Sequence, residues 1–185
     1  TGNGRCNLTN INLRWDNLQY IHSSDIKFAS HILRQFTVEE TISFFESLGI
    51  AHKVENDGKV FPMSDQASSI LDVFLYELKQ LKVNIVCEAN VKAIANKKGK
   101  FEITLENNKK HTADRVIVTT GGKAMPVSGS DGNGYDLATS LGHTVTDVFP
   151  ALVQLMLDGP YFKRISGVKF VGTAELIHKN KSLAR

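Results

Sequence analysis

Apolar residues recur at helical spacing in two consecutive segments near the start of the chain. The spacing is weak over residues 24–36 and stronger over 37–48, where one face carries Ile42, Phe45 and Leu48. Thr37 followed by Glu40 matches a capping box, in which a hydroxyl and a carboxylate satisfy free backbone amides at a helix start. Gly49 tolerates the left-handed conformation that ends many helices. We therefore predict two helices before residue 50.

A third helix is predicted to begin at Ser64-Asp65. Asp65 at its start and Lys79 near its end would complement the helix dipole. Its apolar positions follow a period of about 3.6 residues. They are Ile70, Leu71, Phe74, Leu75, Leu78 and Leu81.

The pattern then changes to that of strands. Residues 83–87 are predicted to form one strand. A small antiparallel meander follows, with strands over 91–95, 101–105 and 111–113. Turns are expected at residues 97–99 and 107–108, where lysines, asparagines and a glycine gather.

Residues 115–120 form an uninterrupted, mostly β-branched run, which is typical of a strand buried on both faces. The run ends in Gly121-Gly122. A second glycine-rich loop over 129–134 leads into a short helix over 135–141, which Gly142 should end. The order of elements predicts an α/β layered domain, in which ligands lie beyond the carboxyl ends of the strands.

The tail from Pro150 shows strand patterning, strongest over 168–177. We predict one domain over residues 1–150 and the start of a second, β-rich domain over 151–185. The first residue is not methionine and the chain opens on a glycine-rich loop, so we expect a piece of a longer protein.

Composition narrows the class of protein. The chain has 185 residues, 42% of them hydrophobic and 22% charged, as in ordinary globular domains. A net charge of +3 and scattered lysines give no nucleic-acid patch, and no run reaches the ~20 apolar residues of a membrane span. Cys6 and Cys87, far apart and without a signal peptide, indicate a reducing cytoplasmic setting.

Two glycine-rich segments are candidates for cofactor contact. Glycines at Thr120-Gly121-Gly122 would let the backbone approach a ligand closely, although on these residues alone a simple tight turn is the better supported explanation. The loop over residues 2–7 lacks both the Lys-Ser/Thr pair of a phosphate loop and the third glycine of GxGxxG. Its flexible backbone, arginine and asparagine suit a flat ring that gains negative charge, such as a flavin. Cys6 is expected to pack beside the ligand rather than act as a redox thiol.

The opening sequence TGNGRCNLTN resembles the signature of the YhiN/BaiN-like flavoproteins, a family of bacterial NAD(P)/FAD-dependent oxidoreductases. Further segments resemble that family in the same order. They are residues 57–64 (DGKVFPMS), 116–122, 129–135, 142–144, 150–155 and 165–168. Lys59 and Gln154 depart from the family's usual arginine and proline.

The resemblance implies a glutathione-reductase-type FAD-binding domain and NAD(P)H as the reductant. It places residues near the flavin, the adenine and the middle of the cofactor, although it names no catalytic acid or base and no metal ligand. The implied FAD contacts are Gly2, Gly4, Arg5, Cys6, Asn7, Asn10, Val91, Thr120, Gly121, Gly122, Asp131 and Gly132. The family's GxGxxG unit would precede Thr1, so we expect this piece alone to bind FAD weakly or not at all.

Other functions are less well supported. The segment 131–136 suggests a calcium loop, but Asp136 and Gly142 stand where an EF-hand needs glycine and glutamate. The six histidines show no metal-ligand spacing. The remaining alternative is a non-catalytic nucleotide-binding or interaction module. For the oxidoreductase we expect a small-molecule substrate and neither a nucleic acid nor a membrane as partner.

Overall fold

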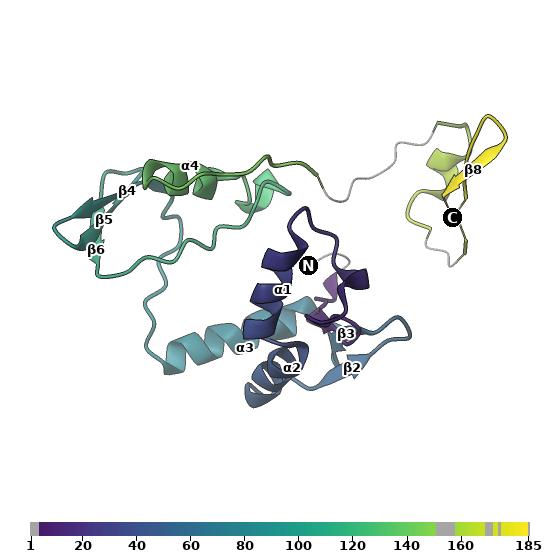
Figure 1. Ribbon diagram of the computed structural model, residues 1–185. Helices are drawn as coiled ribbons and strands as arrows, with labels where there is room; N and C mark the ends of the chain where they lie inside the picture. Colours follow the sequence, from purple (N-terminus) through teal and green to yellow (C-terminus); the bar gives the residue numbers. More distant parts are fainter. Residues whose placement is uncertain (1–3, 151–157, 169–171, 174, 185) are drawn as a thin grey trace. The chain divides into compact units, whose positions relative to one another are not determined.

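The computed structural model describes residues 4–150, 158–168, 172–173 and 175–184 (Figure 1). The chain divides into two compact units, Thr1–Glu88 and Ala89–Arg185, and each is described by itself. Helices and antiparallel sheets occur together, in agreement with the predicted α/β class. Within the described ranges, no helix combines the length and the apolar character needed to cross a bilayer.

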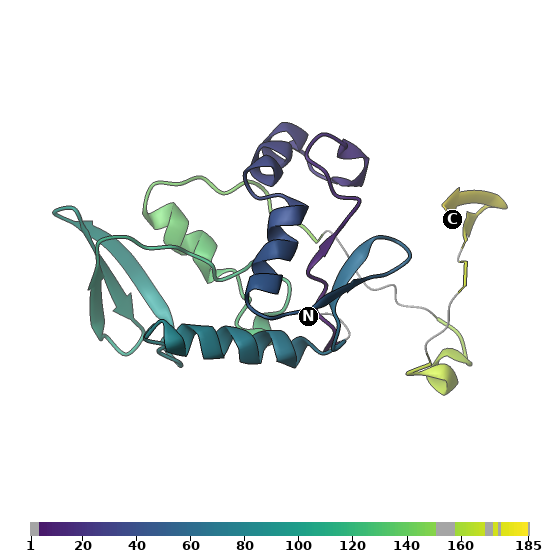
Figure 2. The same ribbon diagram turned by 90° about the horizontal axis from the view of Figure 1, so that it is seen from below.

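A three-stranded antiparallel sheet organises the first unit. Its strands are β1 (Thr9–Asn10), β3 (Lys59–Pro62) and β2 (His52–Val54), in the order β1-β3-β2. Figure 2 shows β1 running alongside the β2–β3 hairpin. Thr9 pairs with Val60, so the residues after the opening loop lie beside the DGKVFPMS segment. Val60 and Pro62 are the most deeply buried large side chains.

The predicted helices of the first unit are present. They are α1 (Ile26–Gln35) and α2 (Val38–Ser47), after the short 3-10 helix η2 (Leu18–Tyr20). Both hydrogen bonds of the Thr37–Glu40 capping box form, which confirms that prediction. Gly49 has a φ of 81° at the end of α2, as a left-handed helix stop requires.

The third helix, α3 (Ala67–Gln80), begins later than predicted. Gln66 is its N-cap, while Asp65 has a left-handed φ of 54° and lies outside the helix. The carboxylate of Asp65 pairs instead with two basic side chains from other segments, which the helical pattern gives no reason to expect. Lys79 does lie in the last turn.

Helices α2 and α3 meet through aromatic rings. The ring centroid of Phe74 lies 5.9 Å from that of Phe45 and 6.3 Å from that of Phe44, distances at which aromatic pairs attract. Of the predicted stripe, Ile70 is buried, but Leu71 and Leu75 are exposed by 57% and 44%. Helical spacing therefore identifies the inward side of α3, and the first unit covers only part of it.

The predicted meander forms the centre of the second unit. Its strands β4 (Val91–Lys97), β5 (Lys100–Leu105) and β6 (Lys110–Ala113) pair in sequence order. Lys98 and Gly99 both have positive φ, the geometry of a two-residue hairpin turn. The neighbouring lysines at positions 97–98 and 109–110 lie in this sheet and its turns. Lys97 and Lys110 both pair with Glu102.

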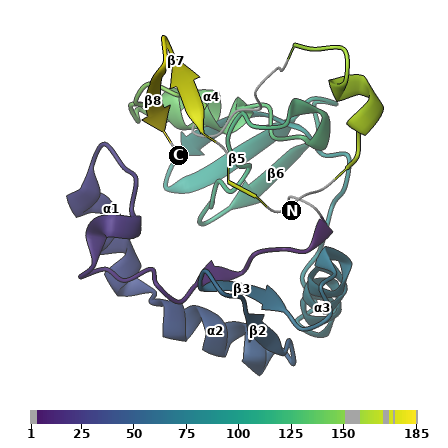
Figure 3. The same ribbon diagram turned by 90° about the vertical axis from the view of Figure 1, so that its right-hand side faces the viewer.

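Helix α4 (Asn133–Ser140) packs on β4, with Leu137 and Ile94 buried (Figure 3). The short helix η3 (Pro126–Ser128) lies upstream of α4. Gly142 follows α4 with a φ of 92°, which confirms the predicted helix end.

Two predicted strands are wrong. Residues 83–87 are exposed and unpaired with any strand of the described chain. Residues 115–120 also form no strand, and Ile117 is 85% exposed. A buried parallel strand needs hydrogen-bonded neighbours and covering layers, and the described residues supply neither at this segment.

The C-terminal part holds the 3-10 helix η4 (Phe162–Ile165) and a hairpin of β7 (Leu176–His178) and β8 (Lys181–Ala184). Lys179 and Asn180 form the hairpin turn with positive φ. The predicted strand over 168–177 overlaps β7 only at Leu176 and Ile177, and part of it lies outside the described residues. The domain boundary at residue 150 stays a prediction.

Val60→Ala should lower the free energy of unfolding of the first unit by about 2 kcal/mol. The change removes two carbons from a side chain with 0% exposure and leaves a cavity. Urea unfolding followed by circular dichroism measures the effect. Val127→Ala removes the same atoms at a position that is 92% exposed, and should change the free energy by less than about 0.5 kcal/mol. Equal effects of the two changes would contradict the assignment of Val60 to the core.

Candidate functional site

The opening loop is held against strand β3 by its backbone. The amide of Leu8 donates to the carbonyl of Val60 at 2.8 Å, and β1 follows directly. Gly4 and Cys6 both have positive φ, 71° and 62°, so the chain turns sharply on either side of Arg5. Gly2 lies outside the described residues, and Asn7 is exposed.

Arg5 is the most extensively bonded of the predicted site residues. Its Nε donates to Oδ1 of Asp65 at 2.9 Å, and Nη2 donates to Glu55. The guanidinium also lies 4.0 Å from the centre of the Phe61 ring, which is cation–π distance. Lys53 donates to the other carboxylate oxygen of Asp65. The opening loop and the DGKVFPMS segment are thus joined through one side chain.

The charges in this cluster stabilise one another. The hydrogen bond to Glu55 raises the pKa of the Arg5 guanidinium, while burial opposes the rise. Hydrogen bonds from Lys53 and then Arg5 hold the pKa of Asp65 below its ordinary value. The Asp65 carboxylate is therefore ionised and paired at neutral pH.

Asn10 also has partners within the protein. Its Oδ1 accepts from the amide of Asn12 at 2.8 Å, and its Nδ2 donates to the carbonyl of Asp57 at 3.1 Å. A Cβ at Gly58 would lie 2.4 Å from the Asn12 side chain and 2.6 Å from that of Asn10. Glycine at 58 is thus required by the close packing of the two asparagines on the β2–β3 turn.

Cys6 is a half-buried free thiol, whereas Cys87 is free and exposed. Cys6 follows Arg5 directly in the chain. The expected placement of Cys6 beside a flavin stays a prediction.

In the second unit, the glycine-rich segments over residues 120–122 and 129–134 lie against each other. The hydroxyl of Ser130 donates to the carbonyl of Gly122 at 2.9 Å. A Cβ at Gly134 would come within 2.2 Å of Oγ1 of Thr120, and a Cβ at Gly122 within 3.1 Å of the Tyr135 hydroxyl. Side chains at 122 and 134 would therefore push the segments apart.

Asp131 and Gly132 shape the start of α4. Oδ1 of Asp131 accepts from the amide of Asn133 at 3.0 Å, and Gly132 is the N-cap with a φ of 91°. A Cβ at Gly132 would lie 3.1 Å from the aliphatic part of Lys123. These contacts hold the loop in place at the N-terminus of the helix, where backbone amides attract anions.

A cavity of about 700 Å³ lies within the second unit. Val91 and Asp131, both predicted cofactor contacts, line it together with the start of β4, η3 and α4. Its volume falls in the range of roughly 300–1,000 Å³ that small-molecule sites occupy. Its lining of backbone, amide and carboxylate groups suits a polar nucleotide portion. The remaining lining residues are Asn90, Lys92, Ala93, Glu106, Pro126, Gly129, Asn133, Asp136, Leu137 and Ser140.

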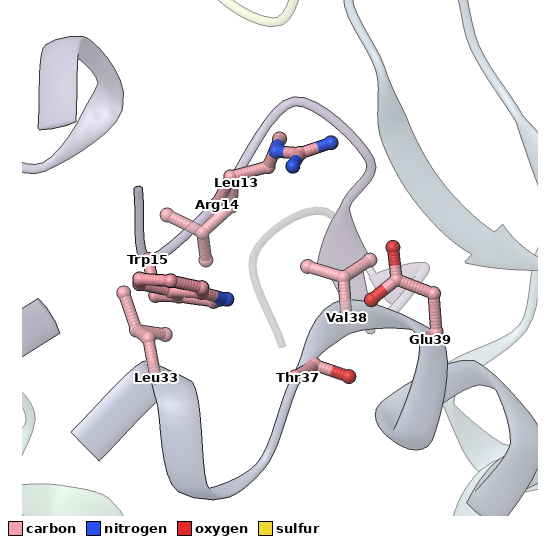
Figure 4. Close-up of a pocket in the computed structure, with 7 residues that line it drawn as sticks. All are labelled: Leu13, Arg14, Trp15, Leu33, Thr37, Val38 and Glu39. Atoms are coloured by element: carbon pink, nitrogen blue, oxygen red, sulfur yellow. The ribbon is translucent and has the colours of Figure 1, made fainter. Parts of the chain in front are cut away.

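A second pocket, in the first unit, contains none of the predicted site residues. Figure 4 shows the Trp15 ring beside Leu33, with Val38 and Glu39 of α2 across the opening. Its volume of about 80 Å³ holds only a few water molecules. We regard it as a packing gap between α1, α2 and the segment after β1.

The structure thus gathers the predicted residues into two groups, one in each unit. Gly4, Arg5 and Cys6 lie in the loop bound to β3, and Asn10 lies at the β2–β3 turn. The second group comprises Val91, Thr120, Gly121, Gly122, Asp131 and Gly132. Sequence reasoning missed Glu55, Ser130 and Tyr135, because contacts between distant segments leave no periodic signal. The one available hint was that Glu55 and Asp65 flank the DGKVFPMS segment.

The model of the family described as "HI0933-like protein Rossmann domain" matches residues 1–177. The chain is 43% identical over 169 residues to a 3-dehydro-bile acid delta(4,6)-reductase of Clostridium scindens, a match that covers 91% of the chain and 40% of that protein. It is 27% identical over 177 residues to a ribosomal RNA dihydrouridine synthase of Escherichia coli, which covers 96% and 43%.

The chain therefore spans less than half the length of the curated relatives it matches. The family match covers nearly all of the chain and agrees with the motif order found in its sequence. The chain belongs to the HI0933-like Rossmann domain family, the group that its motifs identify as YhiN/BaiN-like flavoproteins.

Proposed function

We propose that this chain forms part of the FAD-binding domain of an oxidoreductase that takes hydride from NAD(P)H and passes it to an organic acceptor. The observation that carries the proposal is the family match over residues 1–177, within which the two glycine-rich segments of the second unit lie close together, with Gly122 against the Tyr135 hydroxyl and Gly134 against the Thr120 side chain. FAD, when bound, supplies the hydride-transfer chemistry. The protein binds and orients the cofactor.

We propose roles for each group of residues separately. In the second unit, the polar cavity beside Val91 would hold the adenosine part of FAD, and Thr120–Gly122 would lie along the middle of the cofactor. The turn at Cys6-Asn7 would lie against the flavin ring. We propose a glutathione-reductase-type arrangement for the complete domain and a cytoplasmic location, and we assign no residue as the catalytic acid or base.

The relatives' names suggest the chemical class of the acceptor. One protein is named as a reductase of a 3-dehydro-bile acid and the other as a synthase of dihydrouridine in ribosomal RNA. Both names describe hydrogen added to an unsaturated organic molecule. We propose an unsaturated organic acceptor here, and a small molecule rather than RNA, because the identity to the bile-acid reductase is higher.

The test is anaerobic reduction of the flavin in the whole protein that carries this sequence. After loading with FAD and gel filtration, NADH or NADPH should bleach the visible flavin band, and an unsaturated ketone should restore it. A flavin that neither nucleotide reduces would overturn the oxidoreductase proposal and favour a non-catalytic nucleotide-binding module. Absence of bound flavin would overturn both the cofactor and the activity.

Gly134→Ala should weaken FAD binding by the whole protein on the order of tenfold, about 1.4 kcal/mol. Alanine is the better helix former by about 1 kcal/mol, so a loss of affinity has to come from the clash with Thr120. Fluorescence titration with FAD measures the change. Adding Thr120→Ala removes Oγ1, and the double variant should bind FAD as well as Thr120→Ala alone. An unchanged affinity in Gly134→Ala would show that the two segments do not form the site.

A further inference from the structure

Four charged side chains of the first unit form one connected cluster. Arg5 contacts Glu55 and Asp65, and Lys53 contacts Asp65. The two carboxylates flank the DGKVFPMS segment. Within that segment, the buried ring of Phe61 packs against the guanidinium of Arg5. Glu55, Asp65 and Lys53 belong to none of the sequence motifs.

These contacts leave little of the guanidinium free. Asp65 accepts a hydrogen bond from Nε and lies 2.8 Å from Nη2, Glu55 accepts from Nη2, and one face of the guanidinium lies on the Phe61 ring. The side chain is 28% exposed. Arginine in this geometry is a rigid cross-link, because its planar group is fixed by hydrogen bonds and stacking together. Arg5 itself is therefore better suited to position its neighbours than to bind the cofactor directly.

The neighbour that Arg5 can position is the turn that follows it. Cys6 has a φ of 62°, a conformation that side chains other than glycine rarely adopt without support. Asp65 has a similar φ of 54° at the other end of the contact. The contact between Arg5 and Asp65 thus joins two segments that each contain a residue with a positive φ.

We propose that Glu55 and Asp65 are positioning residues, which hold Arg5 and through it the Cys6-Asn7 turn in the orientation that meets the flavin. The contact of this turn with the flavin rests on the function proposed above. The cluster is not what folds the unit, since its members are partly exposed and such ion pairs contribute little to global stability. The burial of Val60 stabilises the fold of the unit instead. Loss of one carboxylate should therefore loosen the turn and leave the unit folded.

The reactivity of the Cys6 thiol in the 185-residue chain measures directly how firmly the Cys6-Asn7 turn is held. Cys87→Ser leaves Cys6 as the sole thiol, because the chain has two cysteines. Asp65→Asn and Glu55→Gln should each raise the rate of alkylation by neutral iodoacetamide by roughly fivefold, because each removes one ion pair to Arg5. Asp65→Glu, which keeps the charge, should restore most of the original rate. Circular dichroism should give the same unfolding midpoint for these variants within a few degrees.

Asp16→Asn is the matched control. Asp16 also binds an arginine in the same unit, with Nε and Nη2 of Arg14 donating to it at 2.8 and 2.9 Å. Removing this charge should leave the Cys6 rate unchanged. Equal rates in Asp65→Asn, Glu55→Gln and the parent would overturn the proposal, as would an equal rise in Asp16→Asn. Global unfolding of both Asp65→Asn and Glu55→Gln would also overturn it, since the cluster would then serve the fold.

A second measurement links the cluster to the flavin. In the whole protein, Asp65→Asn should lower kcat for flavin reduction several-fold with little change in KM for the nicotinamide nucleotide, and Asp65→Glu should recover it. Unchanged kcat in a protein that does reduce flavin would overturn the positioning role toward the cofactor. If the parent itself does not bind flavin, the proposed function fails, while the thiol measurement still decides whether the cluster holds the turn.

Discussion

The pairing of β1 with β3 is the interaction on which the first unit depends. It places residues 8–11 beside residues 58–60, and Val60 lies between Thr9 of β1 and Val54 of β2. A strand of two residues has little stability of its own, so β1 is held by the neighbours of the pairing. These are the Leu8 amide bond, the asparagine contacts at Gly58 and the Arg5 cluster. Backbone pairing, side-chain amides and charges all act on one short segment.

The second unit depends on a different constraint, the close approach of its two glycine-rich segments. Gly122 and Gly134 leave space that a Cβ would fill, and the Ser130 hydroxyl closes the gap with a hydrogen bond to Gly122. Gly132 then starts α4 from a left-handed conformation. The side chains of Tyr135 and Lys123 lie against Gly122 and Gly132, and the loop borders a cavity lined by Val91 and Asp131. This is the cavity that we propose for part of the cofactor.

The chain belongs to the HI0933-like family. The residues that resemble the flavoprotein signature are bonded within the protein, above all Arg5 and Asn10. Their contacts hold the opening loop and the β2–β3 turn in place, and we propose that Glu55 and Asp65 extend this support beyond the motif.

Much of the local structure could be predicted from the sequence by itself. The Thr37–Glu40 cap, the Gly49 and Gly142 helix ends and the meander follow from interactions within a few residues, which local patterns record. The order of motifs likewise identified the family. The sequence could not show that residues 115–120 lack strand partners, because pairing depends on segments elsewhere in the fold. Nor could it show that Asp65 leaves the helix to bind Arg5, 60 residues away. Such long-range contacts arise only when the tertiary structure brings distant charges and glycines together.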